Sequence, residues 1–236
     1  MPNDDISKLL NEWPHKAGRL NVRITQAPDG RELIQLRIDL GIIQMEMSGR
    51  PDGLLQDGFP SLLTLFEEGG TADGLEPEMC RRLREEGVQR SHRSAALFAI
   101  GRWKETIRDC NENLLLFDLC KYHANDKNDR EALEQFRGAV IALSARAAAE
   151  WAVEEDNIPM AMAALENGLD ELKQTLGEEW EQSNEAQLLH GMKEALVPKL
   201  PRSERVDLKE RLATAIENEN YELAAILRDE IRLLRD

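Results

Sequence analysis

The chain of 236 residues carries a formal net charge of −15, with 32% charged and only 5% aromatic residues. This length allows one or two domains with a substantial core, and the composition is typical of a helix-rich protein. So acidic a chain repels the phosphates of nucleic acid, which disfavours direct nucleic-acid binding by the protein as a whole.

The N-terminal part predicts a small antiparallel sheet. Apolar and polar residues alternate over 20–25 and again over 34–40, and Asp29-Gly30 lies between these two runs. Period-two alternation on both sides of an Asp-Gly turn predicts a β-hairpin. A similar alternation over 43–47 predicts a third strand. A sheet this small needs the following helices to cover its apolar face.

A helical region follows the glycine-rich joint at 69–74. From about Glu76 to Pro198, apolar residues recur every three to four positions in several segments, which predicts a series of helices. Two of these segments, beginning near Ala95 and Ala147, resemble tetratricopeptide-type units, with small residues, a turn and a second helix. Their spacing is longer than the roughly 34 residues of such repeats, so an irregular helical array and an ordinary helix bundle both stay open.

The C-terminal part predicts a helical hairpin after a proline-containing linker at 198–203. Residues 204–236 give two amphipathic helices that are joined by a polar turn at 218–220. Ala224 and Ala225 have almost no side chain, so the helices can approach closely there. Two helices this short cannot bury both of their apolar faces alone, and we expect another surface to cover them.

The second helix of this hairpin carries an ordered series of residue types. The series contains an aromatic residue, an acid, an alanine pair, a Leu-Arg-Asp triplet and an apolar residue: Tyr221, Glu222, Ala224, Ala225, Leu227, Arg228, Asp229 and Ile231. This order resembles the UVR motif of bacterial proteins. Tyr221 departs from the motif, which usually has phenylalanine, and a tyrosine keeps the packing if its hydroxyl reaches water. The resemblance covers the hairpin and no other part of the chain.

The UVR motif is known from the excision-nuclease B and C subunits and from regulators linked to Clp proteases and protein-arginine kinases, where it pairs with another helical hairpin. The resemblance therefore implies a bacterial adaptor that binds a protein partner or a second copy of itself, in nucleotide-excision repair or in Clp-type protein quality control. The alternative is a hairpin that docks on the chain's own helices and completes their core. The residues expected at the partner surface are Leu208, Leu212, Ala215, Tyr221, Ala224, Ala225, Leu227, Arg228, Asp229 and Ile231.

A local excess of basic residues gives a different hypothesis, that of a DNA-repair accessory protein that contacts nucleic acid. The basic residues are Arg81, Arg82, Arg84, Arg90 and Arg93. This strip has no interleaved aromatic residues, and nearby glutamates balance its charge. A solvated helix surface is therefore favoured over a nucleic-acid site.

The sequence shows no catalytic, metal-binding or cofactor-binding pattern. Cys80, Cys110 and Cys120 have no CxxC spacing, and the four histidines are scattered. The acidic N-terminus lacks the pattern of a signal peptide, and no apolar run approaches the roughly eighteen residues of a membrane span. We therefore expect a cytoplasmic, non-enzymatic protein that uses no cofactor or metal.

These patterns together predict an α+β fold that is mostly α-helical. The expected regions are a small α/β region with a β-hairpin at 1–68, a helical, tetratricopeptide-like domain at 75–197, and the UVR-like hairpin at 204–236. The predicted adaptor function depends on the helical domain and the hairpin.

Overall fold

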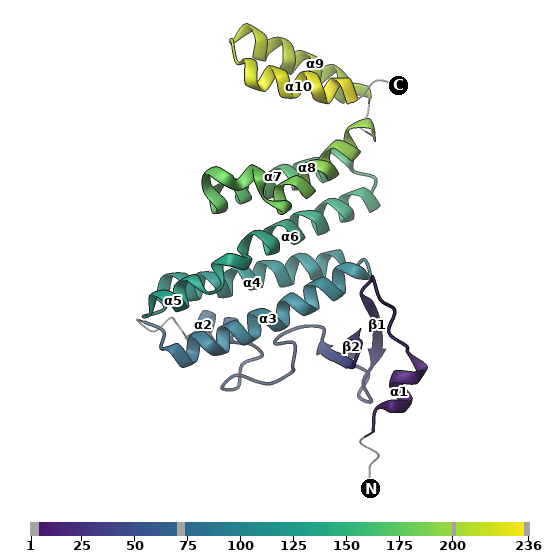
Figure 1. Cartoon of the computed structure of the whole chain (residues 1–236), viewed down its shortest axis with the longest axis vertical. Helices are drawn as coiled ribbons and strands as arrows, with labels where there is room; N and C mark the ends of the chain where they lie inside the picture. The colour runs from purple at the N-terminus through teal and green to yellow at the C-terminus, as the bar shows by residue number, and fades with distance from the viewer. Residues whose placement is uncertain (1–4, 70–73, 200–201, 234–236) are drawn as a thin grey trace. The chain divides into compact units, whose positions relative to one another are not determined.

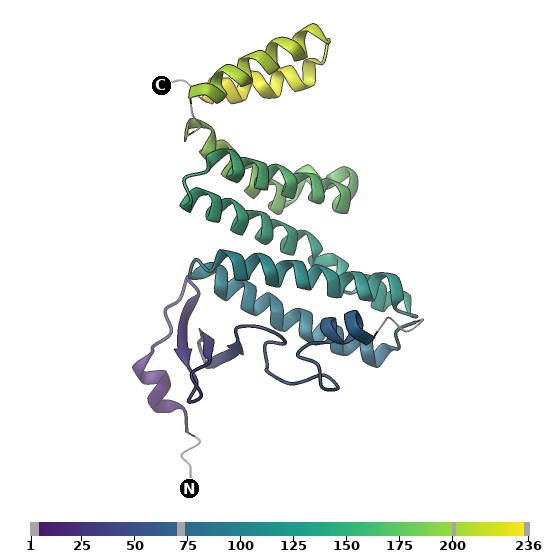
Figure 2. The same ribbon diagram turned by 180° about the vertical axis from the view of Figure 1, so that it is seen from behind.

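The computed structural model describes residues 5–69, 74–199 and 202–233 (Figures 1 and 2). Residues 70–73 of the expected joint and Leu200 and Pro201 of the expected linker lie outside the described residues. The fold is α+β and mostly helical, as predicted: a small sheet near the N-terminus, helices through the middle and a pair of helices at the C-terminus.

The chain divides into two compact units, residues 1–144 and 145–236. The division falls within one long helix, α6 (Glu134–Glu154). The three regions expected from the sequence stay a prediction, as does the tetratricopeptide resemblance. Within the described part of the chain, no helix is both long and apolar enough to cross a membrane.

The predicted three-stranded sheet is present in the first unit. The strands β1 (Asn21–Gln26), β2 (Glu32–Ile38) and β3 (Gly41–Glu46) pair antiparallel in the order β1-β2-β3. Their register sets Val22 opposite Leu36 and Leu36 opposite Ile43, so alternate apolar residues share one face of the sheet. That face is covered by the C-terminal part of α3 (Pro77–Ala99), as the small size of the sheet requires.

One residue of the predicted strand pattern has a different role. Leu40 was expected to continue the apolar face of the second strand, but it lies in the turn between β2 and β3 and is 85% exposed. The carboxylate of Asp39 accepts a hydrogen bond from the Leu40 backbone N–H at 2.9 Å, and the chain reverses there before Gly41. The turn therefore takes Leu40 out of the sheet.

The first unit contains, besides α3, the helices α1 (Ser7–Glu12), α2 (Leu62–Gly69), α4 (Trp103–His123), α5 (Lys127–Glu131) and the first part of α6. Of these helices, α2, α3, α4 and α6 pack around an apolar core, whereas α1 and α5 have no buried residue. The helices α3 and α4 form an antiparallel pair, and Gly101 (φ +74°) gives the left-handed conformation that their short connection needs. Leu83, Leu116 and Phe117 lie fully buried between them.

The second unit contains two further helix pairs. Its elements after α6 are α7 (Ile158–Leu176), η1 (Gly177–Gln182), α8 (Asn184–Leu196), η2 (Val197–Lys199), α9 (Arg202–Glu217) and α10 (Tyr221–Leu233). Asn157 caps α7, because its side chain accepts a hydrogen bond from the Met160 N–H at 3.0 Å. Gly168 allows a close approach in this unit: a Cβ at this position would lie 2.4 Å from the Cβ of Ala145.

Candidate functional site

The C-terminal helices α9 and α10 form an antiparallel hairpin, as the sequence predicts (Figure 1). The turn at 218–220 is polar, and Glu219 has a left-handed backbone (φ +57°). The Asn220 N–H donates to the Ala215 carbonyl at 2.9 Å, which ends α9. The Asn220 side chain then accepts from the Leu223 N–H at 3.2 Å, which caps α10. The turn residues therefore fix where each helix begins and ends.

One row of α10 is buried inside the hairpin. This buried row consists of Ala224, Leu227 and Ile231, which follow one another at i, i+3 and i+7 and so lie on one side of the helix. Ala224 and Leu227 are buried, Leu227 to 1% exposure, and Ile231 is partly buried. The small side chain of Ala224 keeps α9 close to α10 at this row.

The facing row of α9 completes an internal apolar cluster. Leu208 and Ala215 are buried and Leu212 is partly buried in the same cluster as the buried row of α10. Val197 of η2 and Met162 of α7 also pack against this cluster. We expected this seam to need a surface outside the chain, but the two helices and these neighbours cover it. Six of the ten residues expected at the partner surface are therefore part of the hairpin's own packing.

A second row of α10 faces solvent. This Tyr221 row consists of Tyr221, Ala225 and Arg228, at i, i+4 and i+7. All three residues are exposed, Tyr221 to 69%, so Tyr221 is not part of the packing between α9 and α10 that a tyrosine in place of phenylalanine was expected to keep. Asp229 is exposed beside this row, and its Oδ1 lies 3.3 Å from Arg228 Nη2. These four of the expected partner residues are available at the surface.

A third row of α10 was missed by the sequence reasoning. This Ile226 row consists of Leu223, Ile226 and Glu230, again at i, i+3 and i+7. Leu223 and Ile226 are 39% and 52% exposed. The observation that could have revealed the row is the width of the apolar arc, because α10 has more large aliphatic residues than one buried seam needs. On α9, Ile216 is 52% exposed as well.

The comparisons with known proteins agree with the position of this hairpin. Residues 203–236 match the family model described as the UvrB/uvrC motif. The match spans both helices and their turn, so the C-terminal hairpin carries a UVR motif, as the order of residues in α10 predicted. No curated protein and no solved structure matched the chain.

The basic strip of α3 is tied to acidic and polar groups. Arg90 and Arg93 are 1% and 0% exposed. Arg93 donates to both carboxylate oxygens of Asp109, at 2.6 and 2.9 Å, and to the carbonyls of Glu46 and Gly49. The bidentate pair joins α3 to α4, and the bonds to the two carbonyls join α3 to the end of β3 and the segment that follows it. A side chain in this position has no free donor surface for a phosphate.

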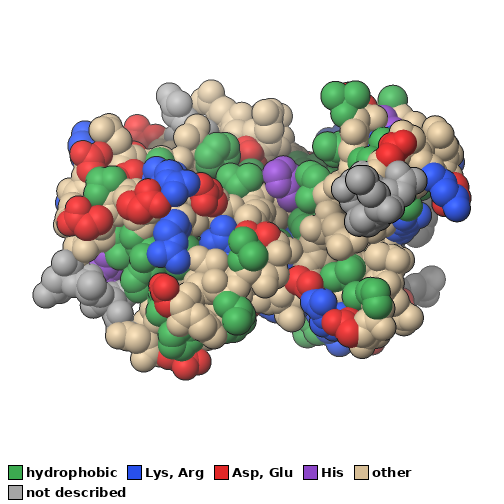
Figure 3. Space-filling model, turned by 90° about the horizontal axis from the view of Figure 1, so that it is seen from below, with side chains coloured by type: hydrophobic (Ala, Val, Ile, Leu, Met, Phe, Trp, Pro, Cys, Tyr) green, Lys and Arg blue, Asp and Glu red, His purple; other side chains and the backbone are tan. Residues whose placement is uncertain are grey.

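The other basic residues of the strip also have partners. Arg90 pairs with Glu86 at 2.8 Å and with Glu112 of α4. Arg81 contacts Glu78 and Glu85. Arg82 donates to Gln56, and Arg84 pairs with Asp129. Figure 3 shows the same mixing of acidic and basic side chains on one face of the molecule. The charge of the strip is therefore largely balanced by its neighbours.

The three cysteines are part of the core of the first unit. Cys80, Cys110 and Cys120 are buried, reduced thiols. Burial raises the pKa of the Cys110 thiol to about 12, and it raises the pKa of the Cys120 thiol to about 12 as well. Among the described residues, no three histidine, cysteine or acidic side chains gather in a way that could hold a metal ion.

Proposed function

We propose that this protein is a non-enzymatic adaptor that binds a protein partner, or a second copy of itself, through the exposed sides of its C-terminal hairpin. The observation that carries this proposal is the contrast between the rows of α10. The buried row is covered within the chain, whereas Tyr221, Leu223 and Ile226 remain 69%, 39% and 52% exposed. Aromatic and aliphatic side chains on a short, capped helix are a common means of protein recognition.

The UVR match supports a protein-interaction role over a catalytic one. The motif occurs in proteins in which it pairs with other helical hairpins, and residues 203–236 carry it here. We infer a bacterial, cytoplasmic protein whose C-terminal hairpin makes the contact with the partner. Nucleotide-excision repair and Clp-type protein quality control are the two pathways that the motif supports.

A deletion experiment tests the proposal. A chain that ends at Lys199 lacks the hairpin but keeps every element from α1 to η2. We expect circular dichroism to show that its helices remain folded, while light scattering or affinity capture shows that association is lost. If association persists at the level of the full chain, the hairpin is not the binding element. If the shortened chain unfolds, the elements before the hairpin need it in order to fold, and the alternative of a docked structural hairpin is correct.

A further inference from the structure

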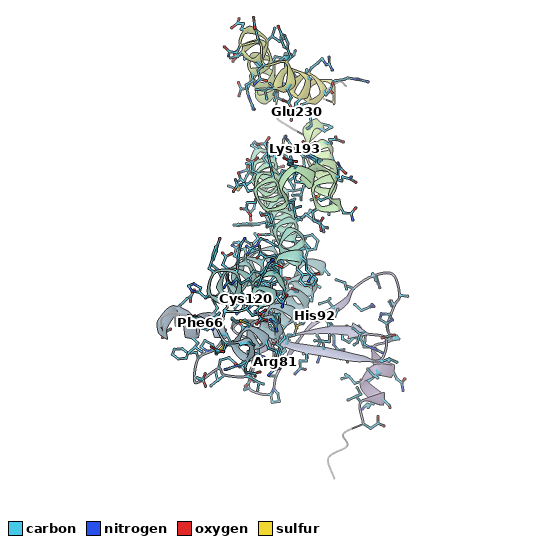
Figure 4. All side chains as sticks on the ribbon, turned by 60° about the vertical axis from the view of Figure 1, so that its left-hand side comes forward. Phe66, Arg81, His92, Cys120, Lys193 and Glu230 are labelled. Atoms are coloured by element: carbon cyan, nitrogen blue, oxygen red, sulfur yellow. The ribbon has the colours of Figure 1, made fainter. Side chains whose placement is uncertain are left out.

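Lys193 of α8 is shared between two acidic side chains on different helices. Its Nζ lies 2.8 Å from Glu166 Oε1 of α7 and 3.1 Å from Glu230 Oε1 of α10. Figure 4 shows Lys193 and Glu230 directed toward one another. The side chains of Lys193 and Glu230 are 17% and 16% exposed, whereas that of Glu166 is 55% exposed. The better shielded of the two ion pairs is therefore the one that holds the hairpin.

The charge on Lys193 is stable in this environment. Burial lowers the pKa of Lys193, but the hydrogen bonds and charges of Glu166 and Glu230 outweigh burial and raise it above its ordinary value. Lys193 is therefore protonated at neutral pH. A partly shielded pair of this kind is screened less by salt than a pair at the open surface.

Glu230 also belongs to the Ile226 row. Leu223, Ile226 and Glu230 follow one another on the same side of α10, so this exposed apolar row ends in the ion pair to α8. A helix that packs along the whole row must contact Glu230. The Lys193 side chain already lies against Glu230, so a helix that also covers this end of the row takes the position of Lys193. Such a helix must then supply a cation of its own, because burying the Glu230 carboxylate without one is costly.

We propose that Lys193 is a latch that holds α10 on α8, and that a partner helix must open this latch to cover the whole Ile226 row. This inference rests on the proposed function of the hairpin. It also defines the chemistry of the partner. The partner helix brings apolar side chains to Leu223 and Ile226 and, about one turn further on, a lysine or arginine that takes the place of Lys193 at Glu230.

Two substitutions, one in α8 and one in α7, change the latch in opposite directions without altering the residues of the hairpin. Lys193→Ala removes the cation and opens the latch. Glu166→Gln removes the competing acid, so that Lys193 pairs with Glu230 alone and the latch tightens. Lys199→Ala is the control, since it removes a nearby exposed lysine of the same unit.

Hydrogen exchange of the α10 amides in the full chain tests the latch itself. We expect exchange about fivefold faster in Lys193→Ala, slower in Glu166→Gln and unchanged in Lys199→Ala. Unchanged exchange in both latch variants, or a change in the same direction in both, overturns the latch. This measurement needs no partner, so its result is independent of the proposed function.

Association of the full chain with a second copy, measured by sedimentation, tests the competition. We expect association about fivefold tighter for Lys193→Ala and weaker for Glu166→Gln. If both variants associate as the unchanged chain does, although deletion of the hairpin abolishes association, the proposed function stands and the competition is overturned. If exchange shifts as expected but no form of the chain associates, the latch stands and self-association as the proposed function fails.

Discussion

Ile226 and Leu227 are neighbours in the sequence and lie in opposite environments, since Ile226 is 52% exposed and Leu227 only 1%. Successive residues of a helix point about 100° apart, so α10 presents large aliphatic side chains on two of its sides. The side of Leu227 is covered by α9. The side of Ile226 is open to solvent. The Leu227 side therefore stabilises the hairpin, whereas the Ile226 side is available for binding.

The first prediction separates these two sides of α10. Leu227→Ala leaves a cavity in the hairpin cluster and should lower the free energy of unfolding of the hairpin by about 2–5 kcal/mol. Ile226→Ala removes an exposed side chain and should change it by less than about 0.5 kcal/mol. Hydrogen exchange of the α9 and α10 amides measures both changes. Equal losses of protection in the two variants would contradict the assigned rows.

The second prediction concerns the buried pair of Arg93 and Asp109. Arg93→Ala leaves the Asp109 carboxylate buried without its cation, so we expect a loss of about 3–5 kcal/mol in the free energy of unfolding. Arg81→Ala is the matched control, since its ion pairs are exposed and solvent screens them, so we expect little change. Urea denaturation of both variants gives the comparison, and a similar small loss for both would show that Arg93 is not structural.

The third prediction uses two glycines of paired helices. Gly168→Ala of α7 would bring a Cβ to 2.4 Å from the Cβ of Ala145 and 3.1 Å from Leu189, so the helices must shift. We expect a loss of about 1–3 kcal/mol. Gly191→Ala of α8 meets nothing within 4 Å and should instead stabilise the protein by about 0.5–1 kcal/mol, because alanine favours the helix. Thermal unfolding should shift in opposite directions for the two variants.

The fourth prediction follows from the buried thiols. The pKa values of Cys110 and Cys120 are raised to about 12 by burial, so both thiols stay protonated in the folded protein and should react slowly with iodoacetamide. The unfolded thiols lose their protons near pH 8.5, and the folded ones do so only near 12. Between these values the folded state binds more protons, so these thiols lower the stability as pH rises.

The pH dependence of unfolding checks this sign. We expect a smaller free energy of unfolding at about pH 10.5 than at about pH 8, and a shallower decline in Cys110→Ala. An identical pH dependence in the variant would show that Cys110 does not contribute. Rapid alkylation of the folded protein would contradict the burial of the thiols.

Local sequence patterns predicted the elements but not all of their packing. Alternation around Asp29-Gly30 correctly placed the sheet, because strand pairing across a short turn is a local property. Leu40 was assigned wrongly, because the turn chemistry of Asp39 ended the strand before the alternation did. The ordered residues of α10 gave the UVR motif, since that motif is defined within one short segment.

The parts of the site that the sequence did not reveal depend on contacts between distant residues. The burial of Arg93 requires Asp109, which α4 brings back against α3. The hairpin seam also packs against Val197 and Met162, which lie in other helical elements of the second unit. The spacing of apolar residues within α10 does not indicate which of its apolar rows those neighbours cover. The exposed Ile226 row could therefore be recognised only in the folded chain.

The most direct test of the adaptor proposal is the association of the full chain when a charge is placed on an exposed side of the hairpin. Ile226→Glu places a charge on the exposed Ile226 row of α10, and Ala163→Glu places the same charge at an exposed position of α7. Light scattering should show association weakened by at least about tenfold in Ile226→Glu and unchanged in Ala163→Glu. Equal association of both variants with the unchanged chain would contradict binding through the hairpin.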